Sequence, residues 1–185
     1  MAEVSITDRI IDLFDATCVM QFESMGCSVL KVENPSSWTG VLSAHIEAVS
    51  EDLSIQLLLI APSPLLAQTM PVGDGYSVAD PDLQKDWLNE LANRFLGRLK
   101  NKLVSLGCIL KIGLPIGGGA VSGEEEYIVG MKEDQIVRCF EIAGDIASDV
   151  LECRLYIKLH NEEVKFLELG DEDESWFREG YLEDL

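Results

Sequence analysis

The sequence predicts an α+β fold with mostly antiparallel strand pairs. Two segments, 5–25 and 82–106, place apolar residues at the three- and four-residue intervals of an amphipathic helix. The second half of the chain is rich in strand-forming residues, with strands predicted at 126–132, 135–143 and 153–159. A mixed first half followed by a strand-rich second half indicates a central, mostly antiparallel sheet flanked by helices in one domain.

The first helical segment is followed by strands. Residues 27–33 predict a short strand, and the turn-forming run 34–38 comes after it. Segments 39–49 and 53–61 are apolar or partly alternating and are separated by a short polar break, so they predict a hairpin. We expect His45 to be an outward-facing strand residue of this hairpin rather than a ligand.

The middle of the chain is expected to hold two helices. Ser63 and Pro64 suit the N-cap and first turn of a short helix. A connector rich in Gly, Pro and Asp, 71–82, leads into the long helix 82–106, for which Gly107 is the expected C-terminal cap.

A glycine-rich segment, 116–123, follows a strand predicted at 108–115. It lacks the Gly-Lys-Ser/Thr ending of a phosphate-binding loop and no helical pattern follows it directly, so we expect a flexible hairpin or turn. The connector between the last two strands, 142–151, is compatible with a helical turn or with continuing strand.

Charge and composition exclude several classes of function. The 185 residues include 33 acidic and 14 basic ones, which gives a formal charge of -19. Such a surface repels polyanions, so we expect no nucleic-acid partner and no anionic membrane partner. The first ten residues lack the pattern of a signal peptide, and the longest apolar run is too short to span a bilayer. A cytoplasmic protein is therefore expected.

Cysteine and histidine usage indicates no metal or disulfide chemistry. The five cysteines are odd in number and form no C-x-x-C motif, and several lie in apolar runs. Buried free thiols in a reducing compartment fit this pattern best. The two histidines are far apart and have no ligand-like neighbours, so no metal site and no cofactor of the chain's own is expected.

The long helix has an unusual polar face. Asp86, Glu90, Asn93, Arg94 and Gly97 lie opposite its apolar stripe. Gly inside a helix costs about 1 kcal/mol relative to Ala, and Asn is a poor helix former. One explanation is a solvated face with an i,i+4 pair of Glu90 and Arg94. The other is a smooth patch beside a polar pair, which lets another molecule approach closely.

The order of these residues resembles the signature of the CheC and CheX chemotaxis phosphatases. The motif Asp86-x-x-x-Glu90-x-x-Asn93 is followed by Gly97 and then by Pro115, with 21 residues between Asn93 and Pro115, one fewer than is usual in the family. The segments 14–26 and 57–70 also resemble the family in outline. Only one copy of the Glu/Asn helix is present, as in the CheX type.

The resemblance implies a CheX-like domain over residues 1–167, whereas the acidic, aromatic tail over 168–185 is not a feature that the family leads us to expect. We expect the tail to form a short amphipathic helix that docks on this protein or on its dimer mate, and a partner-binding tail is the alternative. The resemblance also implies a homodimer.

The resemblance further implies hydrolysis of the aspartyl phosphate of a CheY-like response regulator. Asn93 would orient the attacking water, and Glu90 would pair with the lysine that receiver domains keep beside the phosphoaspartate. We expect the partner to contact Asp86, Arg94 and Gly97, where Gly97 would permit close packing, and Mg²⁺ would belong to the regulator. Asp86 would cap or brace the helix, or act as a first-turn carboxylate that favours the helix dipole. Pro115 would be structural.

A second function class remains open. The chain is also compatible with a non-catalytic module that docks a receiver domain or a flagellar component. The Glu90/Asn93 pair favours the phosphatase, because the middle domains of flagellar switch proteins generally lack it, while the unusual tail keeps the binding module open.

Overall fold

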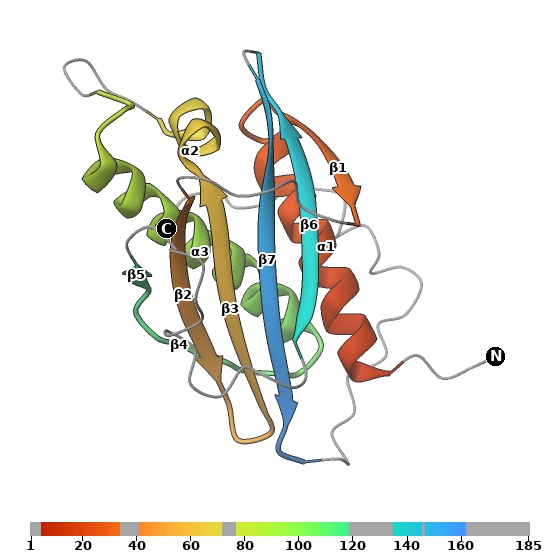
Figure 1. Ribbon diagram of the computed structural model, residues 1–185. Coiled ribbons are helices and arrows are strands. Elements are labelled where there is room, and N and C mark those ends of the chain that lie inside the picture. The colour runs from red at the N-terminus through yellow and green to blue at the C-terminus, as the bar shows by residue number, and fades with distance from the viewer. Residues whose placement is uncertain (1–4, 34–40, 72–76, 119–134, 146, 162–185) are drawn as a thin grey trace.

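The computed structural model describes residues 5–33, 41–71, 77–118, 135–145 and 147–161. These residues form a seven-stranded sheet and three helices, and the long helices α1 and α3 lie on the same face of the sheet (Figure 1). The elements, in chain order, are α1 (Ile6–Glu23), β1 (Ser28–Val32), β2 (Val41–Val49), β3 (Leu53–Pro62), α2 (Ser63–Thr69), α3 (Pro81–Ser105), β4 (Lys111–Ile112), β5 (Ile116–Gly118), β6 (Ile136–Ala143) and β7 (Ser148–Leu159).

The sheet has the strand order β1-β6-β7-β3-β2-β4, with β5 also paired to β2, and every pairing is antiparallel. The predicted hairpin is present as β2 and β3, with Val49 opposite Ser54 at its closed end. The α+β fold class and its antiparallel sheet are therefore confirmed. The boundary at residue 167 and the tail 168–185 lie outside the described residues and stay predictions.

Helix α3 supplies most of the helical side of the core. Its apolar stripe is fully buried and packs mainly against β2 and α1. Phe95 makes edge-to-face contacts with Phe14 and Phe22 of α1, at centroid distances of 6.3 and 5.7 Å. The stripe consists of Leu88, Leu91, Ala92, Phe95, Leu96, Leu99 and Leu103.

Capping interactions of nearby residues define both ends of α3. The Asp80 side chain accepts a hydrogen bond from the Asp82 amide, and Pro81 occupies the first turn, where its missing N–H is not needed. At the other end Gly107 adopts φ 85°, and the Cys108 amide donates to the Leu103 carbonyl at 2.9 Å. This pattern is a Schellman cap, so Gly107 ends the helix as predicted.

The sheet edge beside α3 differs from the sequence prediction. The strand expected over 108–115 pairs with β2 only at Lys111 and Ile112. The first three residues of the glycine-rich segment, for which a hairpin or turn was predicted, form a second short strand, β5, and residues 119–123 lie outside the described residues. Gly117 lies so close to α3 that a Cβ atom there would be 2.8 Å from Lys85 and Asn89. Glycine therefore allows this edge to pack under the helix.

Other differences are smaller. Pro62, not Ser63, is the N-cap of α2, and the Ser63 hydroxyl donates to Gln84 of α3 instead. In the 142–151 connector, the Gly144 amide bonds to the Ala147 carbonyl, and strand β7 starts at Ser148. The strand predicted at 126–132 and the turn predicted at 34–38 lie outside the described residues.

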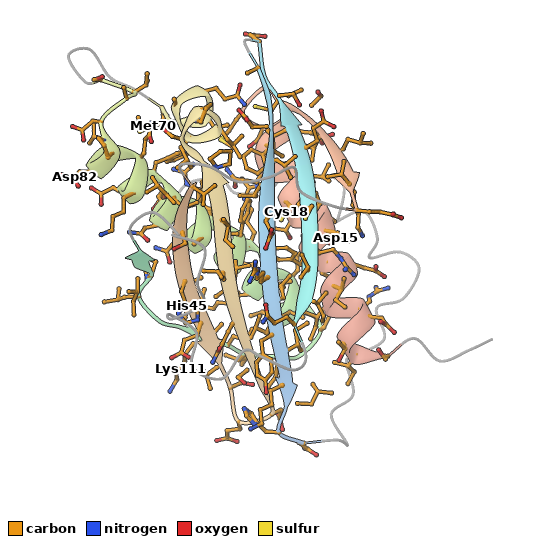
Figure 2. All side chains as sticks on the ribbon, viewed as in Figure 1. Asp15, Cys18, His45, Met70, Asp82 and Lys111 are labelled. Carbon is orange, nitrogen blue, oxygen red and sulfur yellow. The ribbon has the colours of Figure 1, made fainter. Side chains whose placement is uncertain are left out.

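Outward and buried positions follow the predicted alternation in β2. Ala44, Ile46 and Ala48 belong to the core, so His45 projects from the other face of the sheet (Figure 2). It is half-buried, and this burial lowers the pKa of its imidazole. All five cysteines are free and buried.

No helix within the described ranges is long and apolar enough to cross a bilayer.

Two leucine truncations test the assignment of the core. Leu99 is fully buried in the α3 stripe, whereas Leu114, between β4 and β5, is 88% exposed. We expect Leu99→Ala to lower the free energy of unfolding by about 2–5 kcal/mol, because it removes buried contacts and leaves a cavity. Leu114→Ala should change it by less than about 0.5 kcal/mol. Urea unfolding followed by circular dichroism measures both, and equal losses would contradict the buried position of the α3 stripe.

Candidate functional site on helix α3

The polar residues singled out in the sequence lie together on the side of α3 opposite its buried stripe. Asp86, Glu90, Asn93 and Arg94 are exposed, and Gly97 is partly exposed. Packing of the stripe against β2 and α1 fixes the rotation of the helix about its axis, and so it fixes which side chains face outward. The exposed group will be called the α3 polar face.

Glu90 and Arg94 form an ion pair across one helical turn, with 2.7 Å between Glu90 Oε1 and Arg94 Nε. Their side chains are 47% and 43% exposed, respectively. An exposed i,i+4 pair contributes only about 0.3–0.5 kcal/mol. The solvated ion pair considered from the sequence therefore exists, but it is weak enough for another cation to take the place of Arg94.

Trp87 forms a platform under Arg94 that the sequence reasoning missed. The Arg94 guanidinium carbon lies 5.1 Å from the centroid of the Trp87 ring, within cation–π range. Trp87 Nε1 donates to Thr69 Oγ1 at 3.1 Å, and this hydroxyl donates to the Leu65 carbonyl. Arg94 is thereby supported through Trp87 on the end of α2. The spacing of seven residues, two helical turns, is the sequence signal that could have shown this contact.

Asn93 lies one turn after Glu90. Within the described part of the chain its carboxamide makes no hydrogen bond to the protein, although it is exposed beside an ion pair. A carboxamide offers two acceptor sites and two donors. Those of Asn93 are available to orient a water molecule or a ligand.

Gly97 is not required by the packing of the helix. A Cβ atom at this position would meet nothing within 4 Å. The glycine thus leaves bare backbone one turn beyond Asn93, open to close approach from outside. This situation is the reverse of that at Gly117, where α3 itself fills the space.

The structure corrects the interpretation of Asp86. Helix α3 begins at Pro81, Asp80 is its N-cap and Asp82 is its first-turn carboxylate (Figure 2). Asp86 is the sixth residue of the helix and is therefore neither its cap nor a first-turn residue. It is an exposed carboxylate one turn before Glu90. Pro115 lies half-buried between β4 and β5.

Among the residues described, no group of three or more His, Cys, Asp or Glu side chains is arranged to hold a metal ion. On the α3 polar face, Glu90 and Arg94 offer charge to another molecule, and Asn93 offers hydrogen bonds.

Comparison with known proteins shows that this fold occurs in several solved structures. No family model matches the sequence, and no curated protein matches it. Among solved structures, the chemotaxis protein CheX from Vibrio vulnificus matches with a TM-score of 0.62 at 15% identity, covering 84% of this chain and 100% of that one. The CheX of a CheX–CheY–BeF₃–Mg²⁺ complex from Borrelia burgdorferi matches with a TM-score of 0.55 at 14% identity, over 80% and 97%.

The flagellar protein FliY from Thermotoga maritima also matches, with a TM-score of 0.55 at 15% identity, over 79% of this chain and 85% of that one. The chain therefore has the fold of the CheX/CheC-like chemotaxis proteins, which flagellar FliY shares. At these identities the likeness concerns the fold.

Two glycine replacements test whether Gly97 serves the fold. We expect Gly97→Ala to raise the free energy of unfolding by up to about 1 kcal/mol, because alanine favours helix and its methyl group meets nothing. Gly26→Ala is the matched control: its space is equally open, but its φ of 81° is left-handed, so this variant should lose about 1–2 kcal/mol. A loss of stability in Gly97→Ala, measured by urea unfolding, would show that the fold itself requires this glycine.

Proposed function

We propose that this protein is a phosphatase that hydrolyses the aspartyl phosphate of a CheY-like receiver domain. The observation that supports this best is the exposed pair of Glu90 and Asn93, one turn apart on a helix of a CheX-like fold and followed by the open position at Gly97. The surface is convex and exposed, so it suits insertion into the site of another protein more than capture of a small molecule.

Hydrolysis of an acyl phosphate requires few functional groups from the enzyme, which suits a site with one carboxylate and one carboxamide. Phosphoryl transfer passes through a loose transition state in most analyses, so little is required of a base. The main requirement is a water molecule held in line with the breaking bond, and a carboxamide can orient it by accepting and donating hydrogen bonds. Glutamine orients the attacking water in the small GTPases, and we assign the corresponding role to Asn93.

Glu90 serves as the anchor for the partner. In the free protein its carboxylate is paired with Arg94 at 2.7 Å. The lysine that receiver domains keep beside their phosphoaspartate would replace Arg94 on Glu90, which fixes the rotation and depth of α3 in the partner's site. Mg²⁺ would be bound by the carboxylates of the receiver, which are its preferred ligand type.

The structural relatives support a receiver partner. The Borrelia burgdorferi CheX was crystallised as a complex with CheY, BeF₃ and Mg²⁺. The second candidate function is a non-catalytic module that docks a receiver domain or a flagellar component, and the shared fold with FliY from Thermotoga maritima favours it. The two functions differ in whether Asn93 is needed for turnover.

Replacement of Asn93 separates these two functions. We expect Asn93→Ala to lose at least about 100-fold of the acceleration of receiver dephosphorylation, since positioning of this kind contributes several kcal/mol. Affinity for the receiver should stay nearly unchanged. Decay of a ³²P-labelled receiver domain from the same organism measures the rate. Asn101→Ala, which removes an exposed carboxamide two turns further along α3, is the control and should retain activity.

If Asn93→Ala dephosphorylates the receiver as fast as the wild-type protein, the assignment of Asn93 is wrong. If the wild-type protein binds the receiver without accelerating its decay, the docking module is the correct function.

A further inference from the structure

The distribution of charge along the chain is strongly uneven around the α3 polar face. Residues 91–123 contain no Asp or Glu, although 33 of the 185 residues are acidic and a stretch of this length would hold about six on average. The same stretch holds five of the 14 basic residues. They are Arg94, Arg98, Lys100 and Lys102 in the second half of α3, and Lys111 in β4.

Three of the basic residues of α3 form a row on its surface. Arg94, Arg98 and Lys102 follow one another at intervals of four residues, so they are neighbours along one side of the helix. Lys100, two residues after Arg98, projects from nearly the opposite side of the helix and does not belong to this row. Arg94 is exposed, and Arg98 and Lys102 are partly exposed. Arg94, Arg98 and Lys102 will be called the basic ridge.

Members of the ridge are close enough to repel one another. Burial and then the charge of Arg94 lower the pKa of Arg98, and burial and then the charge of Arg98 lower the pKa of Lys102. Arg94 has Glu90 as its partner, whereas Arg98 pairs with no carboxylate within the described residues. Like charges at i,i+4 destabilise a helix, so the row does not serve the stability of α3.

The helix dipole accounts for only part of this row. Cations are favourable in the last turn of a helix, and Lys102 is the basic residue there. Arg98 lies nearly two turns before the end at Ser105, where the effect of the dipole has largely decayed. A protein with a formal charge of -19 needs no extra cations for solubility. Arg98 lies one helical turn beyond Arg94, which belongs to the α3 polar face, so it borders the surface that the partner would approach.

We propose that the basic ridge is an electrostatic docking surface for the anionic rim of a phosphorylated receiver domain, and that Arg98 is its principal residue. This inference rests on the proposed function and deepens it. The partner surface around an aspartyl phosphate is anionic, because the phosphoryl group is charged and Mg²⁺ is held by carboxylates. The acidic remainder of the chain repels such a surface, so the partner is guided to α3 and to Asn93.

The basic ridge also provides a place for the Arg94 guanidinium once docking has broken its ion pair with Glu90. When a receiver lysine takes its place on Glu90, the guanidinium is released beside Arg98. It then adds its charge to the surface that faces the phosphoryl group.

The test compares charge changes at the partly exposed Arg98 and at an exposed lysine outside α3. Arg98→Gln and Arg98→Glu are made on the ridge, and Lys158→Glu is made near the end of β7, outside α3, as the matched control for net charge. Receiver dephosphorylation is measured from low salt to 0.5 M NaCl. At low salt we expect Arg98→Glu to lower kcat/KM about tenfold or more and Arg98→Gln to lower it less, with kcat unchanged. The difference should shrink at high salt, because exposed charges are screened.

Binding provides a readout that does not depend on turnover. The receiver is loaded with beryllofluoride, a stand-in for the phosphoryl group, and Mg²⁺, and its affinity is measured by calorimetry. Arg98→Glu should weaken binding at low salt far more than Lys158→Glu does.

The two readouts separate the ridge from catalysis. The wild-type protein could bind the receiver without hydrolysing its phosphate, while Arg98→Glu still weakens binding more than Lys158→Glu does. In that case the docking role of the basic ridge is supported and the catalytic proposal is wrong. If Arg98→Glu and Lys158→Glu have equal effects on binding at low salt, the ridge is overturned, even where Asn93→Ala abolishes turnover.

Discussion

The burial of one side of α3 is the constraint on which the rest of the site depends. Seven apolar residues of the helix are removed from water against the sheet and α1, and the edge-to-face contacts of Phe95 with Phe14 and Phe22 link the two helices. A helix held in this way cannot turn about its axis without exposing large apolar area. The positions of Glu90, Asn93 and Gly97 therefore follow from residues that never contact a partner.

The strongly periodic parts of the fold were predictable, and the reason is physical. The stripe of α3 and its end at Gly107 are encoded in local sequence, because helical spacing and a left-handed glycine cap act within a few residues. Strand β5 was not predicted, and of the strand predicted over 108–115 only β4 is formed. Their pairing with β2 is made by backbone groups, and the reason for Gly117 lies in Lys85 and Asn89, which are distant in the sequence.

The candidate site, like the fold, has features that the sequence could predict and features that it could not. That Asp86, Glu90, Asn93 and Arg94 would be exposed together followed from periodicity alone. The support of Arg94 by Trp87, and of Trp87 by Thr69, depends on how α2 packs against α3, which no local pattern shows. The roles considered for Asp86 belong to two earlier residues, because the Asp80 side chain caps the helix and Asp82 is its first-turn carboxylate.

The contact between Arg94 and Trp87 has a spectroscopic consequence. Indole emission responds to the charges around the ring, and the Trp87 ring carries a guanidinium 5.1 Å from its centroid. The indole itself is held in place through Thr69 of α2. Any event that draws Arg94 away from Glu90 thus changes the electric field at a fixed chromophore, so the protein contains an intrinsic fluorescent reporter of what occupies its own polar face.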